Sequence, residues 1–404
     1  QKYFNFSQSE FFTPPFPAWM GAVGAALHTE AADLTEKKIF FPRNSSKTTN
    51  PRFPTTTPLS LQKVVRLRDT NISIKLQKNQ TIPAYLGIDI GSVSTNLALL
   101  DQSNKVIHGI YRKTEGRPVD IVKDSLLQIY KQTKDQVHIK GVGTTGSGRE
   151  LIGLLVGADV IKDEITAHKT GAMHVSTHLL NRKVDTIFEI GGQDSKFISI
   201  QDGIVVDFAL NEACAAGTGS FLEEQAHKLG INIIDEFARY ALRSPHPLKL
   251  GERCTVFMEK ELTPYLQKGV SREDITAGLA TSIVLNYLNR VVKKRKIGDA
   301  IFFQGGTAFN DAVAAAFATV LDKEIIIPPH NGIIGAIGAA LLAREYMQNR
   351  EQSSFRGWDL NTMKWELTEF ICSHCSNRCK IQKFSVDGET CYWGDKCSNR
   401  YRKQ

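Results

Sequence analysis

The stretch "GIDIGSVSTN" at residues 87–96 decides the fold class of this chain. An apolar strand delivers Asp89, a turn forms at Gly91 and Ser92, and a second strand follows at once. Glycine lets backbone N–H groups approach phosphate oxygens closely, and a carboxylate beside them can hold a hydrated Mg²⁺ ion. The stretch therefore predicts a phosphate-binding hairpin. It is not a Walker loop, because G-x-x-x-x-G-K-S/T is absent, and taken alone it also fits an ordinary β-turn.

A second stretch, "DTIFEIGGQDSK" at residues 185–196, repeats this pattern. Glu189 and Asp194 flank the pair Gly191 and Gly192 between two apolar strands. This arrangement predicts a second phosphate hairpin with a carboxylate to orient water. Glu189 and Gln193 are both candidates for positioning the attacking water, and the sequence does not choose between them.

A third turn occurs in "AIFFQGGTAFND" at residues 300–311. Gly305, Gly306 and Thr307 end a strand, and a helix follows. We predict that this turn holds adenosine against its backbone. Each turn is a weak signal alone, whereas three in this order indicate a nucleotide site.

Two cysteines precede helix-like runs, Cys214 in "NEACAAGTGSF" (211–221) and Cys254 in "GERCTVFMEKEL" (251–262). The ordinary interpretation of a lone cysteine is a small buried apolar residue. Two thiolates from one chain cannot complete a 4Fe-4S cluster, which takes four, although two such modules face to face could.

The three turns together resemble the actin, sugar-kinase and chaperone ATPase superfamily, in which two α/β lobes close over ATP. The resemblance implies that Asp89, Gly91 and Ser92 form the first phosphate motif. It maps the second phosphate motif and the adenosine motif onto Glu189, Gly191, Gly192, Gly305, Gly306 and Thr307.

The segments "CAAGTG" and "CTVF", with "GTTGSGRELIG" and "DEITAHKTGA", make the match more specific. Over about residues 83–345 the chain resembles the activators of 2-hydroxyacyl-CoA dehydratases and the ATPase subunits of benzoyl-CoA reductases. The resemblance implies bound ATP or ADP with Mg²⁺, and a 4Fe-4S cluster held by Cys214 and Cys254 between two modules. ATP hydrolysis would then drive one low-potential electron into a dehydratase, a reductase or a double-cubane protein.

The same resemblance implies an electron donor such as ferredoxin or flavodoxin. It leaves two forms of pairing open, a homodimer or an intramolecular pair with a second module.

A chain of 404 residues exceeds one compact core. "PPFPAWMGAVGAAL" (14–27) matches "PPHNGIIGAIGAAL" (328–341) without a gap. We therefore expect a piece of a tandem protein. Its first predicted parts are the closing helix of a preceding module (1–30) and a linker (31–82) with one strand near 71–77. A first lobe (83–184), closed by a helix at 331–348, and a second lobe (185–330) with the cluster cysteines follow. The last predicted part is a Cys-rich segment (349–404).

The Cys-rich segment carries Cys372, Cys375, Cys379, Cys391 and Cys397. C-x2-C and C-x3-C spacings favour a second metal site over free thiols. Zn²⁺ and a second iron–sulfur centre both fit these thiolates.

Composition limits the partners and the cellular compartment that this chain can have. The net charge is +8, but much of the basic excess falls in 37–78 and after 377, and no aromatic and basic stripe accompanies it. We therefore expect no nucleic-acid partner. No apolar run reaches about 18 residues and no export signal precedes the seven cysteines, so we expect no membrane span and a reducing compartment, the cytoplasm. The resemblance to the activators implies a role in anaerobic metabolism.

Two pairs at helical i, i+4 spacing, Glu164 with His168 and His174 with His178, could chelate metal. No third ligand is in view, so we expect helix-surface pairs or contacts between lobes.

Two other functions are open. The first is a small-metabolite kinase of the same superfamily, in which Cys214 and Cys254 would have no functional role. The second is a nucleotide-dependent scaffold, which would bind ATP without hydrolysing it.

Overall fold

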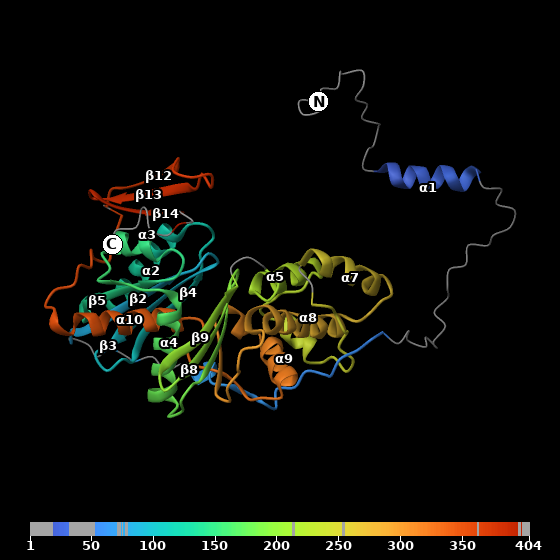
Figure 1. The fold of residues 1–404 in the computed structure, drawn as a ribbon, viewed down its shortest axis with the longest axis horizontal. Helices are drawn as coiled ribbons and strands as arrows, with labels where there is room; N and C mark the ends of the chain where they lie inside the picture. Colours follow the sequence, from blue (N-terminus) through green and yellow to red (C-terminus); the bar gives the residue numbers. More distant parts are fainter. Residues whose placement is uncertain are drawn as a thin grey trace, which may run out of the picture. The chain divides into compact units, whose positions relative to one another are not determined.

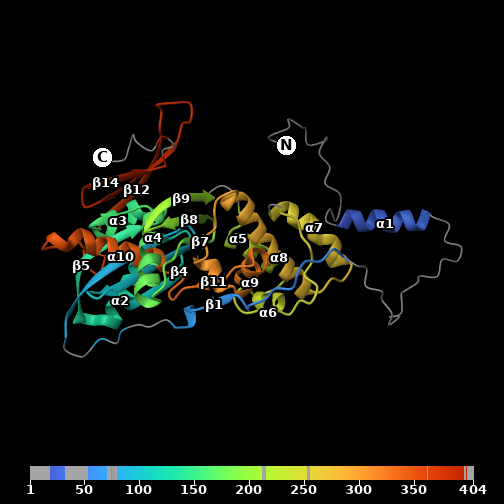
Figure 2. The ribbon, with the colours of Figure 1, turned by 60° about the horizontal axis from the view of Figure 1, so that its bottom comes forward.

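The computed structural model describes residues 19–31, 53–70, 74, 76, 80–211, 215–252, 255–361, 363–394 and 397. The chain divides into two units, Gln1–Arg52 and Phe53–Gln404. Within the first unit the described helix is α1 (Met20–Ala31). The second unit carries two α/β lobes and a small third sheet (Figures 1 and 2).

Lobe I is built on a five-stranded sheet in the order β4-β3-β2-β5-β6. The strands β2, β3 and β4 are antiparallel neighbours, and β5 and β6 continue the sheet in parallel with β2. The bounds of the strands are Ile82–Ile90 (β2), Ser94–Asp101 (β3), Val106–Lys113 (β4), Val137–Thr145 (β5) and Val160–Ile161 (β6). The helices are α2 (Pro118–Thr133), α3 (Arg149–Val156), α4 (Glu164–His174) and α10 (Ile334–Tyr346).

Lobe II is built on a six-stranded sheet in the order β1-β11-β10-β7-β8-β9. Its strands are β1 (Val64–Arg66), β7 (Thr186–Ile190), β8 (Ser195–Gln201), β9 (Ile204–Asn211), β10 (Ile301–Gln304) and β11 (Ile325–Ile327). Its helices are α5 (Gly219–Lys228), α6 (Phe237–Ala241), α7 (Thr255–Gln267), α8 (Arg272–Tyr287) and α9 (Asp311–Leu321). Apart from β1, this sheet repeats the strand order and directions of lobe I, as expected for two similar halves.

Three apolar clusters order the layers of this unit. The outer cluster of lobe I joins α2 and α3 to its sheet, and that of lobe II joins α5–α9 to the other sheet. A middle cluster contains residues of both sheets together with α4 and α10. The two helices therefore lie between the sheets and fix one lobe against the other. Gly338 of α10 makes this packing tight, because a Cβ there would lie 1.8 Å from the carbonyl oxygen of Ala167 on α4.

Local sequence signals explain several boundaries. Strand β2 reads IPAYLGIDI and is buried on both faces over its second half, as a central strand requires. The side chain of Asp163 accepts a hydrogen bond from the N–H of Thr166 and caps α4, and Ser271 and Asn310 cap α8 and α9 in the same way.

The predicted linker differs from the structure over residues 53–70. Strand β1 pairs in parallel with β11, and Leu59 is buried in the core of lobe II. This segment therefore belongs to lobe II. The strand expected near 71–77 lies mostly outside the described residues, although the N–H of Ile74 donates to the Val106 carbonyl at 3.0 Å.

A small antiparallel sheet follows lobe I, formed by β12 (Trp365–Ile371), β13 (Lys380–Val386) and β14 (Glu389–Trp393). Phe384 and Val386 of β13 pack into the outer cluster of lobe I. Arg356 ties the sheet down further through ion pairs with Asp387 and Glu389. Over the described part of the chain, no helix is long and apolar enough to cross a bilayer.

Candidate functional site

Two matching hairpins face each other between the lobes. In lobe I the N–H of Gly91 donates to the carbonyl of Ser94 at 2.8 Å, and in lobe II the N–H of Gly191 donates to the carbonyl of Asp194 at 3.0 Å. The strand register pairs Asp89 with Asn96 and Glu189 with Lys196. The hairpin tips meet closely, because a Cβ on Gly192 would lie 2.5 Å from the side chain of Val93.

A cavity of 420 Å³ lies between these hairpins and collects most of the predicted site residues. Its lining includes Asp89, Gly91, Ser92, Glu189, Gly191, Gly192, Gln193, Asp194, Gly305 and Gly306. Thr307 instead lines an adjoining cavity. The sequence stretches at 87–96, 185–196 and 300–311, which are far apart along the chain, therefore form one site.

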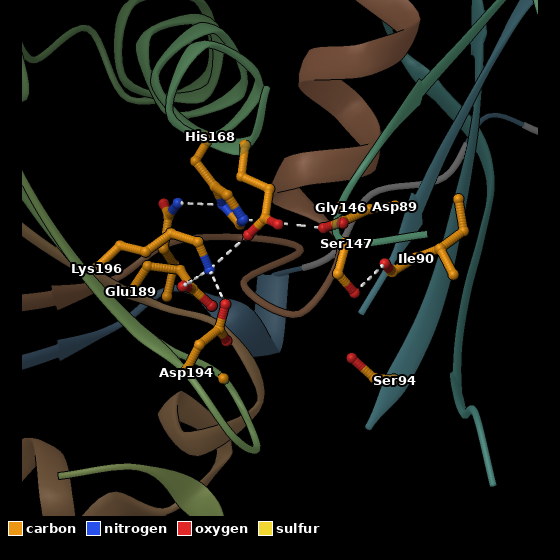
Figure 3. Close-up of polar contacts among 12 residues, drawn as sticks. Asp89, Ile90, Ser94, Gly146, Ser147, His168, Glu189, Asp194 and Lys196 are labelled. Atoms are coloured by element: carbon orange, nitrogen blue, oxygen red, sulfur yellow. Dashed lines mark hydrogen bonds and ion pairs between the residues drawn. The ribbon is translucent and has the colours of Figure 1, made fainter. Parts of the chain in front are cut away.

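Lys196 is the cationic centre of this site (Figure 3). Its Nζ lies 2.7 Å from Glu164 Oε2, 2.9 Å from Glu189 Oε2 and 2.7 Å from Asp194 Oδ2. Burial opposes the charged amine, but the three carboxylates raise the pKa of Lys196 well above its usual value. Glu164 belongs to α4 of lobe I, so this ion pair bridges the lobes.

Asp89 and His168 form the lobe I wall of the cavity. His168 Nε2 lies 3.8 Å from Asp89 Oδ2, and its Nδ1 is 2.9 Å from Gln304 Nε2. Burial, with Lys196 nearby, lowers the pKa of His168 to about 3, so the ring is neutral at pH 7. Burial and the charge of Glu164 raise the pKa of Asp89 to about 7. Asp89 therefore exchanges its proton near neutral pH.

Glu189 faces the same cavity from lobe II. Burial raises the pKa of Glu189 to about 8, although Lys196 opposes this shift. A carboxyl group whose pKa lies near neutral pH can act as a general acid or base, or bind a cation that arrives with the substrate.

The third turn closes the cavity against Glu189. Gly305 has φ of +89°, and a Cβ there would lie 2.6 Å from Glu189 Oε1 and 2.6 Å from the Ile190 carbonyl. Its N–H donates to the Asn331 carbonyl at 3.0 Å. Glycine is required at this position by both the left-handed backbone and the close approach.

An adjoining cavity of 480 Å³ shares Val93, Gly192 and Gly306 with the first. Its other walls are mostly apolar and include Leu222, Ile233 and Phe309. Phe309 packs edge-on against Tyr111 of lobe I, with ring centroids 5.4 Å apart. A polar cavity beside an apolar one has the shape and chemistry to hold a nucleotide's phosphates and base.

The start of α5 is tied directly to the second hairpin. The N–H groups of Gly219 and Ser220 donate to the carbonyls of Gly191 and Gly192 at 2.9 and 2.7 Å. The Ser220 hydroxyl donates to the Gly192 carbonyl as well, at 2.5 Å. Three hydrogen bonds therefore anchor the first turn of α5 to this hairpin.

The predicted cluster cysteines, Cys214 and Cys254, lie outside the described residues. The helices that follow them, α5 and α7, are described and are joined by an ion pair of 2.7 Å between Lys228 and Glu259.

The tail cysteines are not all brought together. Cys372 and Cys379 lie side by side at the two ends of the loop between β12 and β13, where the N–H of Cys372 donates to the Cys379 carbonyl at 2.8 Å. Cys391 instead lies opposite Phe384 on β14, against lobe I. Burial and Glu150 raise the pKa of Cys391 to about 11, which disfavours the thiolate that a metal requires.

Cys375 and Cys397 are exposed. No group of three or more His, Cys, Asp and Glu side chains among the described residues is arranged to hold a metal ion, so the second metal site stays a prediction.

Sequence reasoning gave no role to several residues of the cavity. Lys196 ends the second phosphate stretch, residues 185–196, and the sequence predicts surface or lobe contacts for Glu164 and His168. The lobe-contact alternative is the one that the structure shows for Glu164, because it pairs with Lys196. The other pair, His174 with His178, makes a local contact with ring centroids 4.6 Å apart.

The residues fit a nucleotide with Mg²⁺. The side-chain atoms Asn96 Oδ1 and Ser195 Oγ are buried beside the first and second hairpins without a hydrogen-bond partner. Lys196 already engages three of the carboxylates, so Mg²⁺ would bind through phosphate oxygens and water together with few carboxylates, as Mg²⁺ usually does.

The duplicated lobes and the site between them define an α/β ATPase of the actin and sugar-kinase fold class. The chain belongs to the BadF/BadG/BcrA/BcrD ATPase family, whose model matches residues 86–343. The resemblance found in the sequence is thereby confirmed.

Three relatives indicate its place within the family. The chain is 36% identical over 261 residues to the uncharacterized protein MJ0004 of Methanocaldococcus jannaschii, an alignment that covers 64% of this chain and 99% of that protein. It is 31% identical to the (R)-2-hydroxyglutaryl-CoA dehydratase activating ATPase of Acidaminococcus fermentans, over 64% of this chain and 96% of the relative. The solved activator of the 2-hydroxyisocaproyl-CoA dehydratase from Clostridium difficile, with bound ADPNP, aligns with a TM-score of 0.59 and 28% identity, covering 66% of this chain and 96% of that one.

Proposed function

We propose that this chain is an ATP-dependent activase that passes one electron at low potential to an iron–sulfur acceptor of the dehydratase or reductase type. Cys214 and Cys254 would supply two of the four thiolates of a 4Fe-4S cluster. That cluster supplies a one-electron carrier, which a donor such as ferredoxin or flavodoxin reduces.

The observation that carries this proposal is the link between the second hairpin and α5. Gly219 and Ser220 are hydrogen-bonded to the Gly191 and Gly192 carbonyls, and Cys214 lies five residues before Gly219 in the chain. A phosphate that enters or leaves the hairpin therefore acts on the segment that carries this cysteine. The names of the dehydratase-activating relatives support the same role.

Within the nucleotide site we assign roles by position. The backbone of Gly91, Ser92, Gly191 and Gly192 binds phosphate, and Gly305, Gly306 and Thr307 contact adenosine. Asp89 and Asp194 hold Mg²⁺ through water, and either Glu189 or Gln193 orients the attacking water.

The pairing partner is a second module of the same kind. On α10, Gly335 and Gly338 permit close approach, because a Cβ would lie 2.2 Å from Asp89 Oδ2 and 1.8 Å from the Ala167 carbonyl, respectively. Gly21 and Gly24 hold the equivalent positions in the repeat that contains α1. This match supports assigning residues 1–30 to the closing helix of a preceding module, whose cysteines would complete the cluster.

The test is iron and acid-labile sulfide analysis with the visible spectrum on anaerobically purified and reconstituted protein. We expect the wild type to carry a 4Fe-4S cluster and to hydrolyse ATP. The double variant Cys214→Ala/Cys254→Ala should lose that cluster but keep ATP binding. The matched control, Cys372→Ala/Cys375→Ala, should keep it.

Each outcome has a distinct meaning. Half a cluster per chain would indicate pairing of two chains, whereas a polypeptide with both modules should carry one cluster per chain if the modules pair within it. Iron retained by the Cys214→Ala/Cys254→Ala variant and lost from the control would overturn the ligand assignment. A chain with both modules that binds ATP but no iron would be assigned instead to the phosphotransferases.

A further inference from the structure

Residues 53–70 precede the range that the family model matches, yet they are built into lobe II. The N–H of Thr56 donates to the Pro247 carbonyl and the N–H of Lys249 to the Pro54 carbonyl, both at 2.8 Å. The backbone of this segment then enters the sheet as β1, where the Leu67 N–H donates to the Ile327 carbonyl at 2.9 Å. The residues that follow β1 therefore have fixed positions beside α9.

One of these residues, Arg68, reaches the apolar cavity. Its Nη1 donates to the Ala308 carbonyl at 2.9 Å, and its Nη2 lies 2.7 Å from Asp311 Oδ1. Its side chain is only 16% exposed and lines the 480 Å³ cavity. The guanidinium is thus fixed through its edge nitrogens to the turn that follows Gly305 and Gly306.

The neighbouring Arg66 provides an internal comparison. Its Nη1 lies 2.9 Å from Asp311 Oδ2, the other oxygen of the same carboxylate. Its side chain is 44% exposed, and it does not line the cavity. The two arginines therefore share an ion-pair partner but differ in access to the cavity.

The chemistry of the cavity selects a flat, electron-rich group. Leu222, Ile233 and Phe309 offer apolar surface, and Lys113, the other cation in the lining, is 60% exposed and paired with Glu223 at 2.7 Å. A guanidinium held by its edge nitrogens keeps its faces available, and Arg stacks on aromatic rings through those faces.

We infer that Arg68 is a base-binding residue of the nucleotide site, which stacks its guanidinium on the purine ring. The inference rests on the proposed function, because it requires ATP to bind with its phosphates at the two hairpins and its base in the adjoining 480 Å³ cavity. It adds that the segment before the family's matched range completes the site.

The experiment compares Arg68→Ala, Arg68→Lys and Arg66→Ala by calorimetric titration with Mg²⁺-ATP and with Mg²⁺-tripolyphosphate, which has no base. Loss of a stacked guanidinium corresponds to about a tenfold weaker ATP affinity. We expect that loss for Arg68→Ala and most of it for Arg68→Lys, which keeps the charge but not the plane. Arg66→Ala should stay within about twofold of the wild type, and tripolyphosphate affinity should not change in any variant.

The alternatives are separable. Equal losses of ATP affinity in Arg68→Ala and Arg66→Ala, or a parallel loss for tripolyphosphate, would overturn the inference and assign Arg68 to structure alone. A wild type that binds no Mg²⁺-ATP would overturn the proposed function, and the inference with it. Urea unfolding of each variant without nucleotide identifies any loss that comes from misfolding.

Discussion

Replacing Lys196 with methionine tests the electrostatic account of the site most directly. Among the described residues, Lys196 is the cation in contact with Glu164, Glu189 and Asp194. Methionine fills a similar volume without a charge. The variant therefore leaves three carboxylates in one cavity with no cation against them.

The magnitude follows from how buried each carboxylate is. Removing one partner of a buried ion pair costs about 3–5 kcal/mol. The side chains of Asp194 and Glu164 are 37% and 20% exposed and can be hydrated, whereas that of Glu189 is 6% exposed. We therefore expect the low end, about 3 kcal/mol at pH 8.5. At pH 6 the loss should fall to about 1 kcal/mol, because Glu189, with its pKa of about 8, already holds its proton there.

Urea unfolding of the nucleotide-free protein at pH 6 and 8.5 measures both values. The control is Lys63→Met, because Lys63 lies 2.6 Å from Asp322 with side chains 50% and 89% exposed, and an exposed pair contributes less than about 1 kcal/mol. A loss that is the same at both pH values, or no larger than that of the control, would refute the buried ion-pair account.

Two further predictions concern the packing of α10 against α4 and the dependence of stability on pH. Gly338→Ala would place its Cβ 1.8 Å from the carbonyl oxygen of Ala167, a backbone atom that cannot turn aside. We therefore expect the free energy of unfolding, measured in urea, to fall by about 3 kcal/mol or more. A fall of less than about 1 kcal/mol would mean that α10 can move away from α4 at little cost. The folded-state pKa values of Asp89 and Glu189, about 7 and about 8, exceed their unfolded values, so stability should fall as pH rises from 6.5 to 8.5 and the Asp89→Asn/Glu189→Gln variant should flatten that profile. Below pH 6.5 the lowered pKa of His168 has the opposite effect on stability, since the unfolded state then binds the extra proton. A wild-type stability that does not change with pH above 6.5 would contradict the raised pKa values of Asp89 and Glu189.

The hairpins could be predicted because their signal is local. Asp89, Gly91 and Gly191 stand in short stretches where strand, acid and glycine follow one another. The turn geometry depends on those residues alone, so the sequence carries it without tertiary information.

Lys196 and Arg68 could not be assigned in this way, because their roles depend on residues distant in the chain. Lys196 meets Glu164 only because α4 packs between the two sheets. Arg68 follows a strand of three residues, too short to show an alternating pattern, in a segment whose Thr, Ser and Pro content is typical of a linker.

The two lobes repeat one hairpin but do not repeat its charge. Asp89 faces Asn96 across the strand pair in lobe I, whereas Glu189 faces Lys196 at the equivalent positions of lobe II. The same backbone hydrogen bond closes both turns, so the difference lies in the side chains behind them. Lys196 is in direct contact with three carboxylates, whereas Asp89 has the neutral Asn96 amide and the neutral His168 ring beside it, and the charges of Glu164, Lys196 and Asp194 act on its pKa. The cavity is therefore lined on the lobe II side by an ammonium that is already paired with carboxylates, and on the lobe I side by a carboxyl group whose neighbouring side chains Asn96 and His168 are neutral. The ion pair of Lys196 with Glu164 joins these two environments, so a change of charge at either hairpin acts on a contact between the lobes.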